Sequence, residues 1–164
     1  MNRSTLAAPA PRGALTTLET GYLRVTLPNQ IQAVVPMNAV QEVLALPIHR
    51  ITAIPNMPVP VLGLMNRRSQ ILWLVDLANL LGVGSLELNR QTQPIVVLKQ
   101  GNTLVGFAVA EVEGMIALNP DTFQVPTHTP PSLLPYLQGC TVQNTDIVLV
   151  LNPEAILQAP VLQI

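Results

Sequence analysis

Few residues in this chain have the types and spacing that catalysis or metal binding requires. Asp76 follows an apolar run and could act as an acid–base carboxylate, but its counterpart in an internal repeat is Asn152, which cannot titrate. Both side chains could instead cap a following helix, and capping explains both copies. His49 and His128 lie far apart and have no second ligand at a spacing such as His-x3-His. We therefore predict no catalytic and no metal-binding residues.

The remaining chemical groups favour neither a nucleophile nor a cofactor. Cys140 is the single cysteine, so no intrachain disulfide can form. No basic residue lies near it in the sequence, and we expect a buried structural thiol. Glycine-rich phosphate loops are absent, and one Trp, two Tyr and two Phe are too few for base or sugar stacking. We predict no cofactor.

Two adjacent arginines, Arg67 and Arg68, are the most informative residues. They lie in a polar tip, residues 66–70, between two apolar strand-like runs. An arginine pair at such a tip is commonly solvated surface. The second copy of the repeat has Gln143 and Asn144 there, so the fold does not require the pair. An arginine on a rigid hairpin amid uncharged surface suits binding to a partner carboxylate or carbonyl.

Composition limits the classes of function. Apolar residues make up 49% of the 164 residues and charged residues only 10%, which indicates apolar surface that another protein covers. A net charge of −1 disfavours nucleic-acid binding. The longest apolar runs, residues 71–75 and 147–151, are too short to span a membrane. Residues 1–20 are predicted to be a flexible tail without a signal-peptide core, and the protein is expected in the cytoplasm.

Proline and glycine punctuation predicts an all-β chain. Turn residues at 28–30 and at 100–102 each connect the two strands of an expected hairpin. Residues 77–81 are expected to form a short helix that ends at Gly82. Residues 37–46 carry apolar side chains at helical spacing, which predicts a short helix or turn stopped by Pro47. Residues 119–131 are expected to be a long loop.

An internal repeat organises these elements. A shift of 76 residues places Gly63 on Gly139 and Asp76 on Asn152. Each half reads as a hairpin, a connector and a second hairpin, about five strands, which is the number for a small closed barrel. We therefore expect two small five-stranded, SH3-like β-barrels packed together with short helices, each with its own core and sharing a third.

Four motifs in order resemble the signature of CheW-like domains. They are Val-Gln-Glu-Val at residues 40–43, Ile-Pro-Asn-Met-Pro at 54–58, Val-Leu-Gly-Leu-Met-Asn-Arg-Arg-Ser at 61–69 and Val-Asp-Leu at 75–77. The resemblance covers residue 22 to about residue 158 and implies that residues 21–164 form one CheW-like domain of two β-barrel subdomains. Ser69 departs from the family, which has glycine there. If that position needs a positive φ, serine is strained.

The resemblance also implies which residues contact partners. In the family the Asn-x-Arg-Gly hairpin and the Val-Gln-Glu segment lie on partner-contacting surfaces. Arg67 joins these motif residues as the other half of the arginine pair. The predicted partner-binding set is Val40, Glu42, Gly63, Asn66, Arg67 and Arg68.

The function that the resemblance implies is that of a non-catalytic adaptor. It would couple methyl-accepting receptors to a CheA-type histidine kinase in a two-component taxis pathway, at membrane-associated receptor arrays. The scarcity of lysine suggests a divergent branch, such as the PixI-like adaptors of cyanobacterial phototaxis. An alternative is an accessory protein that docks a response regulator of a phototaxis or pilus motility system. A small β-barrel ligand carrier is disfavoured, because convergent polar groups are scarce.

Overall fold

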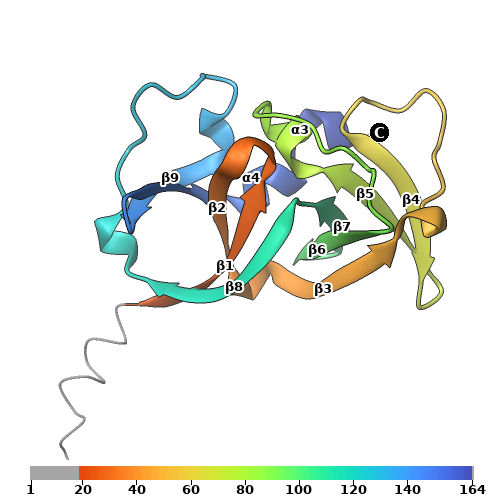
Figure 1. Cartoon of the computed structure of the whole chain (residues 1–164), viewed down its shortest axis with the longest axis horizontal. Helices are drawn as coiled ribbons and strands as arrows, with labels where there is room; N and C mark the ends of the chain where they lie inside the picture. Colours follow the sequence, from red (N-terminus) through yellow and green to blue (C-terminus); the bar gives the residue numbers. More distant parts are fainter. Residues whose placement is uncertain (1–18, 164) are drawn as a thin grey trace, which may run out of the picture.

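Two five-stranded sheets lie side by side in the computed structural model, which describes residues 19–163 (Figure 1). The first sheet has the strand order β8-β1-β2-β10-β9, and the second has the order β3-β6-β7-β5-β4. The strands are β1 (Thr20–Leu27), β2 (Ile31–Pro36), β3 (Val40–Pro47), β4 (Val61–Arg67), β5 (Gln70–Asp76), β6 (Thr92–Gln100), β7 (Thr103–Ala108), β8 (Glu111–Leu118), β9 (Leu137–Gln143) and β10 (Asp146–Leu151).

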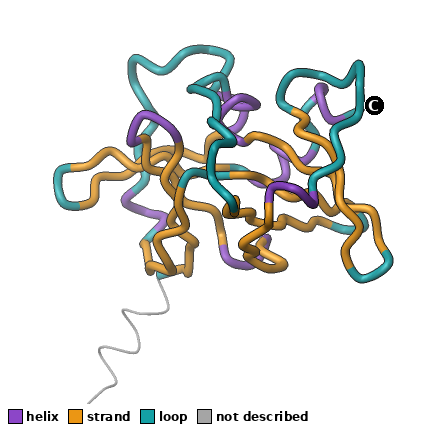
Figure 2. The backbone as a smooth tube through the Cα atoms, turned by 45° about the vertical axis from the view of Figure 1, so that its right-hand side comes forward, coloured by secondary structure: helices purple, strands orange, loops and turns teal. Residues whose placement is uncertain are grey.

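Short helices connect the strands (Figure 2). The α-helices are α3 (Leu77–Leu81) and α4 (Pro153–Leu157), and the 3-10 segments are η1 (Pro28–Gln30), η2 (Met37–Ala39), η3 (Ile48–Arg50), η4 (Pro120–Thr122), η5 (Leu134–Tyr136) and η6 (Pro160–Leu162). None of the helices in this described part is long and apolar enough to cross a membrane. Of the predicted flexible tail over residues 1–20, residues 1–18 lie outside the described residues, and β1 begins at Thr20.

The two halves of the repeat exchange strands. Hairpin β1–β2 from the first half pairs with β8 and β10 from the second half. Hairpin β6–β7 from the second half pairs with β3 and β5 from the first. The expectation that each half of the sequence forms its own barrel is therefore wrong. Each sheet needs strands from both halves, because the second hairpin of one half lies beside the first hairpin of the other.

The all-β class with two five-stranded units and short helices is confirmed, but the predicted closed barrels are open sheets. Between residues 19 and 163, no ladder joins edge strands β3 and β4, or β8 and β9. Single-residue bridges approach closure instead. Thr52, beyond β3, bridges Leu64 of β4, and Gln124, beyond β8, bridges Cys140 of β9.

The apolar residues form three cores, as the composition predicted. Leu74, Ile95 and Val97 belong to the core inside the second sheet, and Val34 and Val148 to the core inside the first. The third and largest core lies between the sheets and takes residues from both, together with α3 and α4. Its members include the fully buried side chains Val25, Leu27, Phe107, Leu151 and Ile156.

Asp76 and Asn152 cap their helices, as predicted. The Asp76 carboxylate accepts a hydrogen bond from the backbone N–H of Asn79 at 3.2 Å, and the Asn152 side chain accepts one from Ala155 at 3.1 Å. The second oxygen of Asp76 accepts a hydrogen bond from the backbone N–H of Leu86 at 2.8 Å. This buried carboxylate is therefore occupied in holding the connection that follows α3.

The predicted helix or turn over residues 37–46 is a strand over most of its length. Exposure alternates from Val40 to Ala45, which is the period of a strand with one face covered. A bulge between Val40 and Glu42 shifts the register against β6. Val40, Val43 and Leu44 have the spacing of one helix face, but a run of neighbouring apolar residues fits the period of a strand equally well. Pairing with β6 decided the conformation.

Candidate partner-binding site

The β4–β5 hairpin ends in a two-residue turn, Arg68-Ser69. Arg67 pairs with Gln70 across it, and the φ angles of Arg68 and Ser69 are 52° and 65°. Positive φ at both central residues matches the right-handed twist of the flanking strands. Ser69 therefore occupies a left-handed position that favours glycine, at a cost of about 1 kcal/mol. The result is a tight, well-defined tip.

Arg67 forms a bidentate ion pair with Glu42. Its Nε donates to Glu42 Oε1 at 2.9 Å, and its Nη2 donates to Oε2 at 2.6 Å. The Arg67 and Glu42 side chains are 30% and 26% exposed, so the pair is partly shielded from water. Such parallel hydrogen bonds define both distance and orientation. We call this pair the latch.

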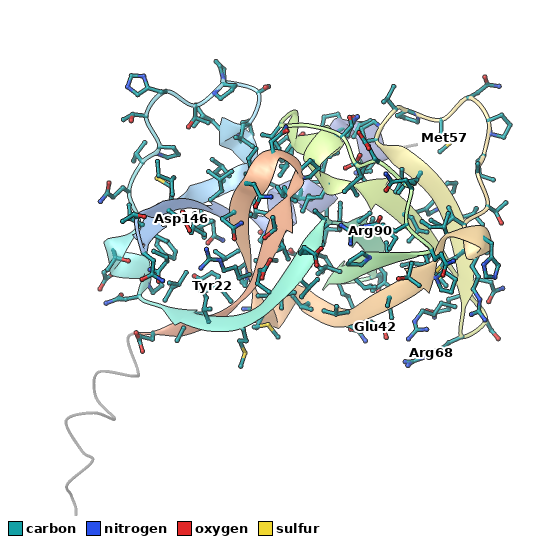
Figure 3. The ribbon with its side chains drawn as sticks, in the orientation of Figure 1. Tyr22, Glu42, Met57, Arg68, Arg90 and Asp146 are labelled. Atoms are coloured by element: carbon teal, nitrogen blue, oxygen red, sulfur yellow. The ribbon has the colours of Figure 1, made fainter. Side chains whose placement is uncertain are left out.

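Arg68 lies beside the latch without sharing it. Its Nη2 is 3.9 Å from Glu42 Oε2, beyond hydrogen-bonding distance, and its side chain is 76% exposed. Figure 3 shows Glu42 and Arg68 at the same edge of the molecule, with the Arg68 side chain pointing outward. The guanidinium donors of Arg68 are thus available to a partner.

The latch joins the two unpaired edges of the second sheet. Glu42 lies on β3 and Arg67 on β4, and these strands are the opposite edges of the order β3-β6-β7-β5-β4. A side-chain ion pair therefore connects the two edge strands here, which a backbone ladder would connect in a closed barrel. The hairpin tip is tied to the Val-Gln-Glu strand and carries Arg68 at a set position.

A family model for the CheW-like domain matches residues 21–161, most of the chain and all of the latch. The chain belongs to the CheW-like domain family. The protein PilI of Pseudomonas aeruginosa is 33% identical to this CheW-like chain over 128 residues, which are 76% of this chain and 68% of PilI. The crystal structure of the scaffolding protein TtCheW from Thermoanaerobacter tengcongensis superposes with a TM-score of 0.70 at 18% identity, over 81% of this chain and 88% of that one.

These comparisons decide the fold and the broad class of function. The TtCheW likeness shows the fold, and the family match shows a non-catalytic scaffold of chemosensory signalling.

Asp76, the candidate acid–base carboxylate, is buried and already hydrogen-bonded, and His49 and His128 lie exposed on separate segments. Among residues 19–163, no three His, Cys, Asp or Glu side chains form a group that could hold a metal ion. Cys140 is only partly buried, since it lies on an edge strand, so the expected buried thiol is corrected.

Only some of the predicted partner-binding residues lie together in the structure. Glu42, Arg67 and Arg68 meet at the latch, and Asn66 is exposed beside them on β4. Val40 instead packs against the core between the sheets. Gly63 is buried, where a Cβ atom would lie 2.2 Å from the carbonyl oxygen of Thr52. Partner contact by any of these residues stays a prediction.

Sequence reasoning missed the residues around the latch, of which Gln41 and Ile71 are examples. Gln41 and Ile71 line a shallow groove beside Glu42, Arg67 and Arg68. The Ile71 side chain is 55% exposed, which is unusual for a large aliphatic residue in a strand. Its position just after the hairpin tip, on the outward side of an alternating strand, was the available signal.

The Arg67 guanidinium holds the pKa of the Glu42 carboxyl below its ordinary value, mainly through the hydrogen bonds that it donates. Partial burial opposes this shift, and the Coulombic attraction of Arg67 and Arg68 adds to it. The same hydrogen bonding raises the pKa of Arg67. Both members of the latch are therefore charged at neutral pH.

We expect the stabilisation by Glu42 to disappear in acid. A carboxyl with a lower pKa in the folded chain stabilises the fold above its unfolded-state pKa, about 4.3 for glutamate, and this contribution is lost as the pH falls through the folded-state pKa. The parent chain should melt at a higher temperature than Glu42→Gln at neutral pH, and the difference should shrink below about pH 4. A difference that does not vary with pH, or an equal one for the exposed control Glu87→Gln, would contradict this role of the latch.

Proposed function

We propose that this chain is an adaptor that joins methyl-accepting receptors to a CheA-type histidine kinase. Family membership over residues 21–161 supports the class of partner, and the latch supports a preformed contact surface. The proposal places the protein in the cytoplasm, at membrane-associated receptor arrays. Its role is to hold partners together, and the signal itself passes through the kinase.

The single observation that carries the proposal is the exposed Arg68 on a tip held by the latch. Arg67 occupies both oxygens of Glu42 with hydrogen bonds, and Arg68, 3.9 Å from Oε2 and largely exposed, forms no hydrogen bond with that carboxylate. A partner carboxylate would gain charge-assisted hydrogen bonds there, with little conformational entropy lost by the tip. The exposed Ile71 side chain beside it supplies apolar area, so the surface combines a charged group with a hydrophobic one.

Similarity to PilI supports a particular branch of this function. The match covers 76% of this chain at 33% identity, and it favours a chemosensory system of pilus-based motility. We propose that the receptor and kinase partners belong to such a system. Phototaxis as the stimulus stays a prediction from the resemblance to PixI-like adaptors.

Arg68→Glu should weaken kinase or receptor binding at least about 30-fold, the scale of an interface hot spot, while leaving the melting temperature nearly unchanged. Arg50→Glu is the matched control, since Arg50 is also exposed but lies on η3. Binding would be measured by calorimetry with the purified kinase and receptor cytoplasmic domains encoded in the same genome.

Equal affinities of parent and Arg68→Glu for both partners would contradict the proposal, as would an equal loss in Arg50→Glu. A parallel titration with response regulators from the same system tests the alternative function. Tight binding of a receiver domain together with no binding of the kinase would replace the adaptor role by the accessory role.

A further inference from the structure

The internal repeat gives the first sheet two positions equivalent to Glu42 and Arg67 of the latch. Other residue types occupy both positions. The repeat makes β8 the counterpart of β3, and both strands carry a bulge at the same place. Glu42 of β3 pairs with Val97 of β6, and Gly114 of β8 pairs with Arg24 of β1. Gly114 therefore stands in the first sheet where Glu42 stands in the second.

The arginine of the latch is replaced as well. Arg67 is the last residue of β4 and pairs with Gln70, and Gln143 is the last residue of β9 and pairs with Asp146. The first sheet thus has a glycine and a glutamine in place of the ion pair. No carboxylate–guanidinium bridge can close this side of it at these positions.

An open, polar hollow occupies this side of the first sheet. Its volume is about 550 Å³, compared with about 80 Å³ for the groove at the latch. The hollow is lined by Glu113, the neighbour of Gly114, and by Asp146, the partner of Gln143, and a Cβ atom on Gly114 would meet no atom within 4 Å. The charged and amide side chains around the hollow are Arg24, Asn29, Gln30, Gln32, Arg90, Glu111, Glu113 and Asp146.

A chain of hydrogen bonds positions the groups in the hollow. Arg24 Nε donates to Gln32 Oε1 at 3.0 Å, and Gln32 Nε2 donates to Thr26 Oγ1 at 3.0 Å. The Thr26 hydroxyl in turn donates to Glu113 Oε2 at 2.7 Å. Thr26, which donates directly to Glu113, is only 6% exposed, whereas Glu113 itself lies at the surface. Glu113 is therefore oriented by a buried partner.

The charges in the hollow do not balance. Arg24 lies 3.6 Å from Asp146, and Arg90 lies 3.3 Å from Glu111. Over residues 19–163, no lysine or arginine nitrogen comes within 4.0 Å of the Glu113 carboxylate, and Glu113 Oε1 accepts no hydrogen bond from another side chain. The hollow thus presents one oriented carboxylate without a cation, next to amide groups and with room for a long side chain.

We propose that this hollow is a docking site for a basic side chain, arginine or lysine, of a protein partner. The Glu113 carboxylate accepts the charge-assisted hydrogen bonds of the entering cation, and the volume admits its aliphatic stem. The site is opposite in sign to the exposed Arg68. In Figure 3, Asp146 at one rim of the hollow lies toward the end of the long axis opposite Arg68, and Arg90 at the other rim lies between them. The chain would then hold partners by opposite charges on its two sheets, with Arg68 on the second and the hollow on the first.

Titration of the full-length, ¹⁵N-labelled chain tests the site directly. The probes are three capped tripeptides of glycine with a central arginine, glutamine or glutamate. The arginine peptide should shift the amide signals of Thr26, Gln32 and Glu113, and the glutamine and glutamate peptides should leave them in place. Raising the salt from about 0.05 to about 0.5 M should weaken the arginine response several-fold, because exposed charge pairs are screened.

Glu113→Gln should bind the arginine peptide about tenfold more weakly, because a neutral amide replaces the charged acceptor. Glutamine keeps an oxygen for the Thr26 hydroxyl, so the relay and the fold are retained. Glu87→Gln, which removes an exposed carboxylate from the segment between the halves, is the control and should bind as the parent does. Absence of shifts at the hollow, equal affinity of Glu113→Gln, equal response to the glutamine peptide or indifference to salt would each overturn the proposal.

Discussion

Gly63→Ala should destabilise the protein by about 3 to 5 kcal/mol or prevent it from folding. Gly63 has a φ of 145°, which an L-residue adopts only with strain. The added Cβ would also lie 2.2 Å from the Thr52 carbonyl oxygen and 2.8 Å from its carbon. These are backbone atoms that cannot rotate away, because Thr52 and Leu64 exchange both hydrogen bonds of a bridge, at 2.8 and 2.9 Å. Urea unfolding monitored by circular dichroism would measure the loss.

Alanine substitutions at two other glycines distinguish the cost of backbone strain from the cost of a steric clash of the added Cβ atom. Gly114 has a φ of 119° with nothing near its Cβ position, so alanine there meets only the backbone strain. Gly139, the repeat counterpart of Gly63, has a φ of 155° and a Cβ position 3.0 Å from the Gln124 carbonyl oxygen. The expected order of destabilisation is Gly63→Ala, then Gly139→Ala, then Gly114→Ala. Equal losses at Gly63 and Gly114 would show that the close approach of the Thr52 backbone matters little.

Neither half of the chain should fold alone when the two are produced separately, cut between Glu87 and Leu88. Four ladders join strands of different halves: β1 with β8, β2 with β10, β3 with β6 and β5 with β7. Each isolated half would keep only its own hairpins, which are marginally stable in water. The core between the sheets would also lose Phe107 or its partners Val25 and Leu27.

Mixing the two halves should restore the fold. Far-ultraviolet circular dichroism and amide proton dispersion would follow the change from two disordered fragments to one assembled pair. The matched control is the intact chain cleaved at an inserted protease site at the same position, which should stay folded because the ladders remain. A cooperative melt from either isolated half would contradict the exchange of strands.

Local features were predicted well from the sequence. The turn at Pro28–Gln30 and the helix at Leu77–Leu81 depend on residues within a few positions of one another, and the structure has them where expected. The caps Asp76 and Asn152 were correct for the same reason. The fold class followed from the repeat, because about five strands in each half indicate the size of each sheet.

Non-local features were not predictable in the same way. Both the separate and the exchanged arrangement bury the same faces of β1 and β6, so periodicity cannot choose between them. The strand β3 was misread because its pairing with β6 overrides local spacing. Glu42 and Arg67 were singled out as separate charges, but their bidentate contact spans 25 positions and depends on how the edges of the sheet meet. The motif residues marked the region of the site, and only the structure distinguished Arg67, which is hydrogen-bonded to Glu42, from Arg68, which is largely exposed.

The core between the sheets also limits how far the two binding surfaces can move relative to each other. The Arg68 tip belongs to the second sheet and the hollow at Glu113 to the first, and the largest core lies between the sheets and takes residues from both. Bending one sheet against the other would expose buried side chains of this core, such as Val25, Leu27 and Phe107, which opposes such a motion. Partners bound at Arg68 and at the hollow would therefore be held at a nearly constant separation, and a displacement of one partner would be passed on to the other.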